Sequence, residues 1–304
     1  MKRFVVILFI FYCGAAFAQA IPGVVGADAK VQLVQDKFVF LEGPVPTADG
    51  GLYFSDIFKG NKTYRMDPSG KISVFRQNAN GSNGLALMRD GTLIAAEADA
   101  TRITKVAPDG TATTLTDGTA SQPLLWPDDL LADSKGGIYF SDPGKRPLTP
   151  GHKAYTYYLP AGSKTPRELD SQITRPNGIT LTNDEKTLIV DDTVGEVVYA
   201  FDVNKDGSVK NKRLFTKVHD IPPGKESGAD GIAIDRADRL FVACVNGVQV
   251  FDRKGAYLGI IQVPGQATNI AFGGPQKRTL YITSRDGGLY SLQTLTEGPK
   301  RLGK

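Results

Sequence analysis

The chain has 304 residues, of which 41% are hydrophobic and 22% charged, a composition typical of globular rather than disordered or fibrous proteins. Its 34 glycines and 18 prolines predict short segments with frequent turns and argue against an architecture of long helices. The formal net charge is only +4, without a run of Lys or Arg, which argues against a surface that binds nucleic acid or a membrane through clustered basic residues.

The first residues have the pattern of a secretory signal peptide. Lys2 and Arg3 form a basic start, Phe4 to Tyr12 form an apolar stretch, and Ala16-Phe17-Ala18 is a small-x-small cleavage site. We therefore predict a signal peptide over residues 1–18 and a periplasmic or secreted mature chain that begins near Gln19. The apolar stretch is too short for a membrane span and no second one follows, so no membrane association is expected after cleavage.

The two cysteines predict no internal disulfide. Cys13 lies in the predicted signal peptide, and the bulky Tyr12 before it does not suit a lipidation motif. Cys244 would then be the only cysteine of the mature chain, and it lies in an apolar run over residues 240–245. A buried structural thiol is therefore favoured over a nucleophile.

One pattern recurs six times along the mature chain: a polar residue, often followed by Gly, then an apolar pair, a turn and a second apolar run. Successive copies start 39 to 53 residues apart. The leading polar residues are Glu42, Asn83, Asp128, Asn177, Asp230 and Asn269. Each second run, such as Leu52-Tyr53-Phe54, is short and rich in β-branched or aromatic residues, and a third and sometimes a fourth such run follow.

Four short strands per copy are typical of a β-propeller blade. We predict an all-β, six-bladed β-propeller that forms a single domain over residues 19–304. A β-sandwich has strands of similar length but does not repeat internally six times. The last copy ends near Leu292 with too little chain for a fourth strand, and Val31–Gln35 is an apolar alternation without a blade of its own. This N-terminal strand is therefore predicted to close the last blade.

In a propeller the first strand of each blade lines the central channel, so the six leading residues should converge there. They are three carboxylates and three amides, and channel-lining acids repel one another unless a cation lies between them. Such a ring of oxygens suits Ca²⁺, with Mn²⁺ or Zn²⁺ as alternatives, whereas one Cys and two His do not favour tetrahedral structural zinc. For any single copy, Asn or Asp before Gly is also ordinary turn chemistry.

Other catalytic motifs are missing from the sequence. It has no G-x-S-x-G elbow, Walker loop, H-E-x-x-H or dinucleotide-binding fingerprint. His152 and His219 lie in polar, Pro- or Gly-flanked stretches, where a surface position is the default. His152, in the long insertion over residues 142–153, is the better candidate to reach over the channel mouth and contact a substrate.

Five fragments in order resemble the family of senescence marker protein, gluconolactonase and luciferin-regenerating enzyme, whose members are six-bladed calcium-type propellers and include sugar lactonases. The resemblance covers roughly residues 40–292. Its marks are Glu42-Gly43-Pro44, Asn83-Gly84-Leu85, Arg175-Pro176-Asn177-Gly178-Ile179, Asp230-Gly231-Ile232 and Thr268-Asn269-Ile270-Ala271-Phe272.

The resemblance implies metal ligands at Glu42, Asn177 and Asp230, and places Asp128 where many members have an Asn that binds metal or substrate. The pair Asp128-Asp129 resembles some bacterial lactonases of the superfamily. Trp126 stands where sugar lactonases of the senescence-marker type carry an Arg that contacts substrate hydroxyls. An aromatic wall there favours stacking on a sugar ring or a more apolar lactone.

The resulting hypothesis is metal-dependent hydrolysis of a small-molecule lactone by a monomer or weak oligomer. Asp230, or alternatively Asp129, would position and deprotonate the attacking water, while Asn83 and Asn269 would hydrogen-bond the substrate. Two alternatives remain open: a phosphotriesterase-type hydrolase of the same fold, and a non-enzymatic binding propeller in which the metal only ties the blades together.

Overall fold

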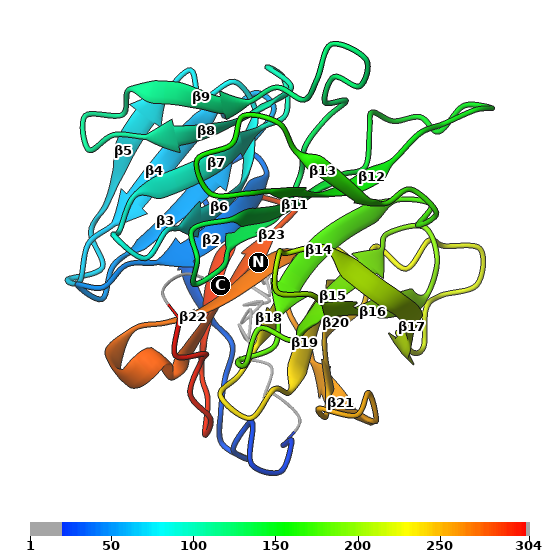
Figure 1. Ribbon diagram of the computed structural model, residues 1–304. Coiled ribbons are helices and arrows are strands. Elements are labelled where there is room, and N and C mark those ends of the chain that lie inside the picture. The colour runs from blue at the N-terminus through cyan, green and yellow to red at the C-terminus, as the bar shows by residue number, and fades with distance from the viewer. Residues whose placement is uncertain (1–19, 302–304) are drawn as a thin grey trace, which may run out of the picture.

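The computed structural model describes residues 20–301, and these form six four-stranded antiparallel sheets arranged around a central axis (Figure 1). The predicted signal peptide and its cleavage site lie outside the described residues. No helix of the described part is long and apolar enough to cross a membrane. The all-β, six-bladed β-propeller predicted from the sequence is confirmed.

The first three blades contain consecutive strands. Blade 1 contains β2 (Leu41–Pro46), β3 (Leu52–Asp56), β4 (Lys62–Met66) and β5 (Ile72–Gln77). Blade 2 contains β6 (Ser82–Leu87), β7 (Leu93–Glu97), β8 (Arg102–Val106) and β9 (Ala112–Thr116). Blade 3 contains β10 (Leu130–Ala132), β11 (Ile138–Asp142), β12 (Tyr155–Leu159) and β13 (Arg167–Asp170).

The last three blades follow the same order, except that blade 6 takes its outer strand from the other end of the chain. Blade 4 contains β14 (Pro176–Leu181), β15 (Thr187–Asp192), β16 (Val197–Val203) and β17 (Val209–Lys217). Blade 5 contains β18 (Ile232–Ile234), β19 (Leu240–Cys244), β20 (Gly247–Phe251) and β21 (Tyr257–Ile261). Blade 6 contains β22 (Ala267–Gly273), β23 (Thr279–Ser284), β24 (Leu289–Gln293) and β1 (Gln32–Gln35), with a 3-10 turn at Pro275–Lys277.

The first strand of each blade contacts the first strands of both neighbouring blades, including β2 with β22, so these strands surround the axis. The hydrophobic core is correspondingly divided between the blades. Leu41 and Phe54 of blade 1 pack with Tyr281 and Leu289 of blade 6, and comparable clusters fill the other five interfaces between blades. Each sheet therefore buries both faces against its neighbours, which explains why the inner strands are buried along almost their whole length.

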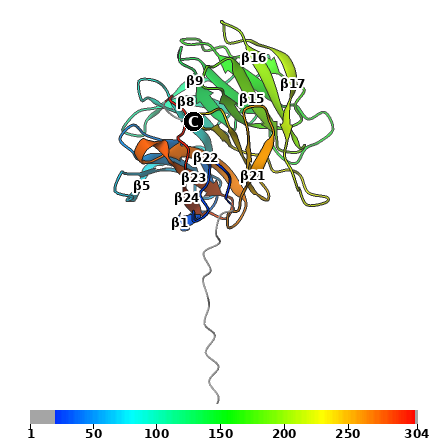
Figure 2. The same ribbon diagram turned by 90° about the horizontal axis from the view of Figure 1, so that it is seen from below.

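The predicted N-terminal closing strand is confirmed, because β1 pairs antiparallel with β24, with Leu33 opposite Tyr290 (Figure 2). Its side chains are nevertheless mostly exposed, and Leu33 retains 52% of its accessible surface. The buried part of this segment lies earlier, where Ile21, Val24 and Val25 pack into the core between blades 5 and 6. Ring closure thus depends on backbone pairing by β1 and on apolar anchoring by Ile21–Val25.

Candidate functional site

The leading residues lie at or just before the start of the inner strands, and in four blades the strand is irregular there. Between Glu42 and Val45, β2 advances three residues while β3 advances two, so one extra residue is inserted. Equivalent shifts occur in the inner strands of blades 2, 4 and 6. A bulge of this kind re-aims a side chain out of the regular alternation. Glu42 and its counterparts can therefore turn toward the axis although the strands continue into a packed core.

The glycines behind the leading residues permit close approach between blades. A Cβ on Gly84 would lie 2.5 Å from the backbone oxygen of Asp128, and one on Gly178 would lie 2.1 Å from that of Asp230. The Gly84 N–H also donates to Asp128 O at 2.9 Å, which ties blade 2 to blade 3. These glycines are needed because the next blade occupies the space of a side chain.

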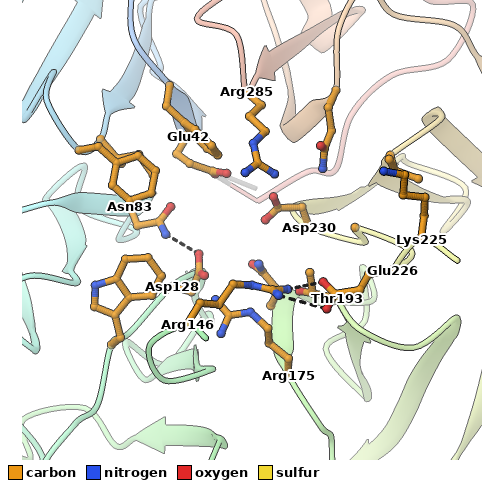
Figure 3. A pocket seen from close by; sticks show the side chains of 18 of the residues that line it. Glu42, Asn83, Asp128, Arg146, Arg175, Thr193, Lys225, Glu226, Asp230 and Arg285 are labelled. Atoms are coloured by element: carbon orange, nitrogen blue, oxygen red, sulfur yellow. Dashed lines mark hydrogen bonds and ion pairs between the residues drawn. The ribbon is translucent and has the colours of Figure 1, made fainter. Parts of the chain in front are cut away.

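A cavity of about 540 Å³ opens at the end of the axis where the leading residues gather. Six of the nine predicted site residues line it, and Figure 3 shows several of them pointing into a common space. The six are Glu42, Asn83, Trp126, Asp128, Asn177 and Asp230. We call the carboxylates of Glu42, Asp128 and Asp230 the floor of the cavity.

Asn269 and Asp129, two of the remaining predicted residues, lie behind this floor. The side chain of Asn269 is 1% exposed, its Nδ2 donates to Glu42 Oε2 at 3.0 Å, and its Oδ1 accepts from the Ile270 N–H. Asp129 is also 1% exposed, and its backbone N–H donates to Ser141 Oγ. Asn269 therefore supports Glu42 through a hydrogen bond, and neither Asn269 nor Asp129 lines the cavity.

His152 does not line the cavity either. It is half-buried in the connection between β11 and β12, close to Gly144, and its Nε2 has no hydrogen-bond partner among the described residues. This position does not support the prediction that His152 reaches over the channel mouth. The β11–β12 connection places the imidazole ring against the backbone of the same connection, near Gly144.

The floor carries strong electrostatic repulsion. Burial raises the pKa of Asp230 well above its usual range, and the negative charges of Glu42 and Asp128 raise it further. Asp191, at the end of β15, is fully buried and shows the same direction of shift, although the Gly178 N–H donates to its Oδ1 at 3.0 Å. Asp191 was not identified as a site residue from the sequence. It directly follows the apolar run of a strand, where an Asp is easily interpreted as the start of a turn.

Amide groups around the floor have unused acceptors. Asn83 Nδ2 donates to Asp128 Oδ1 at 2.6 Å, while Asn83 Oδ1 and Asn177 Oδ1 are buried without a hydrogen-bond partner in residues 20–301. Within the same residues, no three acidic, histidine or cysteine side chains lie close enough together to chelate an ion by themselves. The donor set is one of carboxylate and amide oxygens, and unsatisfied buried oxygens beside repelling carboxylates fit a hard divalent cation.

A second layer of acidic residues holds the backbone just before the leading residues. Asp142, the last residue of β11, accepts from the Leu125 and Trp126 N–H groups at 2.7 and 2.6 Å. Asp56 and Asp192, at the ends of β3 and β15, accept equivalent backbone bonds. Burial raises the pKa of Asp142 to about 6. The sequence signal for this role was the Asp that ends the second strand of blades 1, 3 and 4, preceded by Ser in β3 and β11.

Four cationic side chains also line the cavity, none of which was predicted from the sequence as a site residue: Arg146, Arg175, Lys225 and Arg285. Arg175 is buried, and its Nη1 donates to Gly144 O at 2.8 Å. Burial lowers its pKa, which the charges of Asp128 and others oppose. Arg146 forms a two-pronged ion pair with Glu226. These cations lie outside the strands, in connections within or between blades, where the repeat pattern gives no information.

Residues 40–286 match the protein family described as "SMP-30/Gluconolactonase/LRE-like region". The gluconolactonase of Zymomonas mobilis is 24% identical over 295 residues, which cover 88% of this chain and 82% of that protein. The lactonase drp35 of Staphylococcus epidermidis is 28% identical over 244 residues, which cover 77% of this chain and 72% of that protein.

Solved structures have the same architecture. A gluconolactonase from Xanthomonas campestris superposes with a TM-score of 0.79 at 27% identity, covering 92% of this chain and 97% of that one. A calcium-binding protein, regucalcin, from Agrobacterium tumefaciens has a TM-score of 0.76 at 19% identity, covering 89% and 95%, and shows the fold alone. The named lactonases support lactone hydrolysis as the activity, and because the family match spans most of its length, the chain belongs to the SMP-30/Gluconolactonase/LRE-like family.

Proposed function

We propose that the cavity hydrolyses a lactone with the help of one divalent cation held by Glu42, Asn177 and Asp230, with Asp128 as a further ligand. The observation that carries the proposal is the cluster of repelling carboxylates beside the unpartnered oxygen of Asn177. A bound cation would supply Lewis acidity toward the lactone carbonyl oxygen and stabilise the negative charge that develops there.

Asp230 is the residue best placed to hold the attacking water. It is only partly buried, it lines the cavity, and its carboxylate accepts no hydrogen bond from the described residues. Its carboxylate would accept the proton of the attacking water. Water adds to the carbonyl carbon, the ring C–O bond breaks, and the ring oxygen takes up a proton. The product is an open-chain hydroxy acid, ionised at neutral pH.

The substrate would lie between polar and aromatic walls. Asp128 fixes the orientation of Asn83 through its bond to Nδ2 and leaves the Asn83 carbonyl free to accept from a substrate hydroxyl. Trp126 is half-buried and held by Asp142, which supports a stacking role on one face of the ring.

Ca²⁺ is the proposed ion because the oxygen donor set includes amide groups and leaves room for water. The calcium-binding neighbour regucalcin agrees with this choice. We further propose that the mature chain begins near Gln19 and acts in the periplasm or outside the cell. Amino-terminal sequencing of protein recovered from the periplasm tests the cleavage site.

The decisive experiment compares chelated protein with protein reloaded with Ca²⁺, Mn²⁺ or Zn²⁺ on a panel of aldonolactones and other lactones. We expect chelation to abolish turnover and one ion to restore it. Asp230→Ala should remain folded by circular dichroism and lose at least hundredfold in kcat, as expected for a residue that acts on the attacking water. Full lactonase activity in chelated protein would refute the metal role.

Two other outcomes would replace the proposal. Faster hydrolysis of a phosphotriester than of any lactone would identify a phosphotriesterase-type hydrolase. Loss of thermal stability on chelation, without hydrolysis of any compound in the panel, would identify a binding propeller whose metal only joins the blades.

A further inference from the structure

The cavity has an acidic floor and a cationic rim. The floor carboxylates are those of Glu42, Asp128 and Asp230, and Arg175 lies buried among them. The rim is formed by the exposed parts of Arg146, Lys225 and Arg285, which come from the connections around blades 3, 5 and 6. Figure 3 shows these acidic and basic side chains around one common space.

Two of the rim cations have no acidic partner within the protein. Among the described residues, no carboxylate lies within ion-pair distance of Lys225 or Arg285. The acid next to each in the sequence is engaged elsewhere: Glu226 pairs with Arg146, and Asp286 accepts a hydrogen bond from Ser284. The cavity wall therefore presents two unpaired positive charges that the protein does not use.

Arg285 is also positioned rather than free in solvent. Its guanidinium lies over the Phe40 ring at 5.7 Å, and Phe40 packs edge-on against Phe58 with ring centroids 5.2 Å apart. In Figure 3 the guanidinium projects inward, toward the space between Glu42 and Asp230. A planar guanidinium held over an aromatic ring keeps its forked N–H donors available for an oxyanion.

The balance of charges in the cavity would change when a divalent cation binds to the floor carboxylates. In the fully ionised cavity, Glu42, Asp128, Asp230 and Glu226 balance the four cations. A divalent cation on the floor would leave an excess of two positive charges, and the unpaired ones lie at the rim. A neutral substrate would leave this excess uncompensated, whereas a substrate with its own negative group would neutralise part of it.

We propose that the substrate is a lactone with a negatively charged substituent, a carboxylate or a phosphate, bound by Arg285 with the help of Lys225. This inference rests on the proposed lactonase function and adds the substrate class. The lactone carbonyl would face the floor while the anionic group at the far end of the molecule would reach the rim. An Arg fork binds both oxyanions through charge-assisted hydrogen bonds, so the two sources share one chemistry.

The test uses substrate pairs that differ only in charge at the far end. D-Glucaro-1,4-lactone has a carboxylate where D-glucono-1,4-lactone has a hydroxymethyl group, and 6-phospho-D-glucono-1,5-lactone is matched with D-glucono-1,5-lactone. We expect about a tenfold higher kcat/KM for at least one charged member, equivalent to about 1.4 kcal/mol. The preference should shrink as NaCl is raised, because salt screens exposed charges.

Variants locate the effect. Arg285→Gln should lower kcat/KM for the charged lactone about tenfold and change that of its neutral partner less than twofold, and Lys225→Gln should have a smaller effect of the same sign. Arg253→Gln is the matched control, because Arg253 is an exposed Arg in the β20–β21 turn, away from the cavity. Equal kcat/KM within both pairs, or an equal loss on both members in Arg285→Gln, would overturn the inference.

A binding measurement separates this inference from the proposed function. Trp126 is the only tryptophan of the chain and lines the cavity, so intrinsic tryptophan fluorescence reports occupancy directly. Titration of the Ca²⁺-loaded protein with D-glucarate and D-gluconate should give a lower Kd for the dianion, and Arg285→Gln should remove the difference. Charge-selective binding without hydrolysis of any lactone would sustain the anion subsite and refute lactonase function. Hydrolysis of both lactones with no charge preference, and equal Kd values, would do the reverse.

Discussion

Replacing Asp230 by Asn should stabilise the metal-free protein and destabilise the metal-loaded one relative to the parent. Asn has nearly the same shape but no charge, so the substitution removes the burial cost of the carboxylate and its repulsion by Glu42 and Asp128, the causes that raise its pKa. Each pKa unit of such a shift corresponds to about 1.36 kcal/mol between the two protonation states.

In chelator at pH 7.5, the free energy of unfolding of Asp230→Asn should exceed that of the parent by about 1–2 kcal/mol, a gain typical when a strained functional residue is replaced. This corresponds to roughly 2–8 °C in Tm. With Ca²⁺ at a hundred times the parent's Kd, binding stabilises the parent by about 2.7 kcal/mol. A variant with hundredfold weaker affinity gains only about 0.4 kcal/mol under the same conditions. The order of the two Tm values should therefore invert between chelator and Ca²⁺.

Differential scanning calorimetry in both conditions measures this inversion. Asp109→Asn is a suitable control, because Asp109 lies in an exposed turn where the Thr111 N–H donates to it and its pKa is lowered. That variant should change stability by less than about 0.5 kcal/mol, equally with and without Ca²⁺. The reasoning is refuted if Asp230→Asn melts below the parent in chelator, or if Ca²⁺ raises both Tm values equally.

Two further perturbations test other parts of the structure. Burial raises the pKa of Asp142 to about 6, so the folded protein holds this proton more tightly than the unfolded chain does. The free energy of unfolding of the metal-free protein should therefore fall as pH rises from about 4 to 6, by up to about 3 kcal/mol. Chemical denaturation across this range measures how the free energy of unfolding changes with pH. In Asp142→Asn this pH dependence should become weaker and the Trp126 emission should shift. An unchanged pH dependence would show that another group titrates. Val24→Ala, at a fully buried site, should cost about 2 kcal/mol, whereas Leu33→Ala on the exposed β1 should cost less than about 0.5 kcal/mol. Equal costs would refute the conclusion that Ile21–Val25 contributes more side-chain anchoring than β1.

The sequence predicted the ring and its polar leading residues because both repeat. Six copies that start 39 to 53 residues apart identify blades, and equivalent positions must meet at the axis, so Glu42, Asp128, Asn177 and Asp230 could be grouped without coordinates. Depth along the axis was not predictable in this way. Asn269 leads its repeat like Asn83 and lies beside an equivalent bulge, but its amide donates to Glu42 behind the floor, whereas Asn83 donates to Asp128 and lines the cavity.

The cationic rim was missed for a related reason. Arg285 and Lys225 lie in turns and connections that differ from one repeat to the next, so no internal comparison marks them. Asp142 and Asp192, by contrast, stand at equivalent strand ends, and their repeated bonds to the backbone before the leading residues explain a pattern that the sequence contained but that we had not interpreted.

Because β1 pairs with β24, the ring can close only after the whole chain has been synthesised. Blades 1 to 5 each draw their strands from one continuous stretch and can form in the order in which the chain is made, but blade 6 needs residues from both ends. A product that stops early leaves β1 without a partner and an open sheet edge, which exposes it to aggregation and proteolysis. The β1–β24 pairing thus allows only full-length molecules to close the ring and complete the axial cavity.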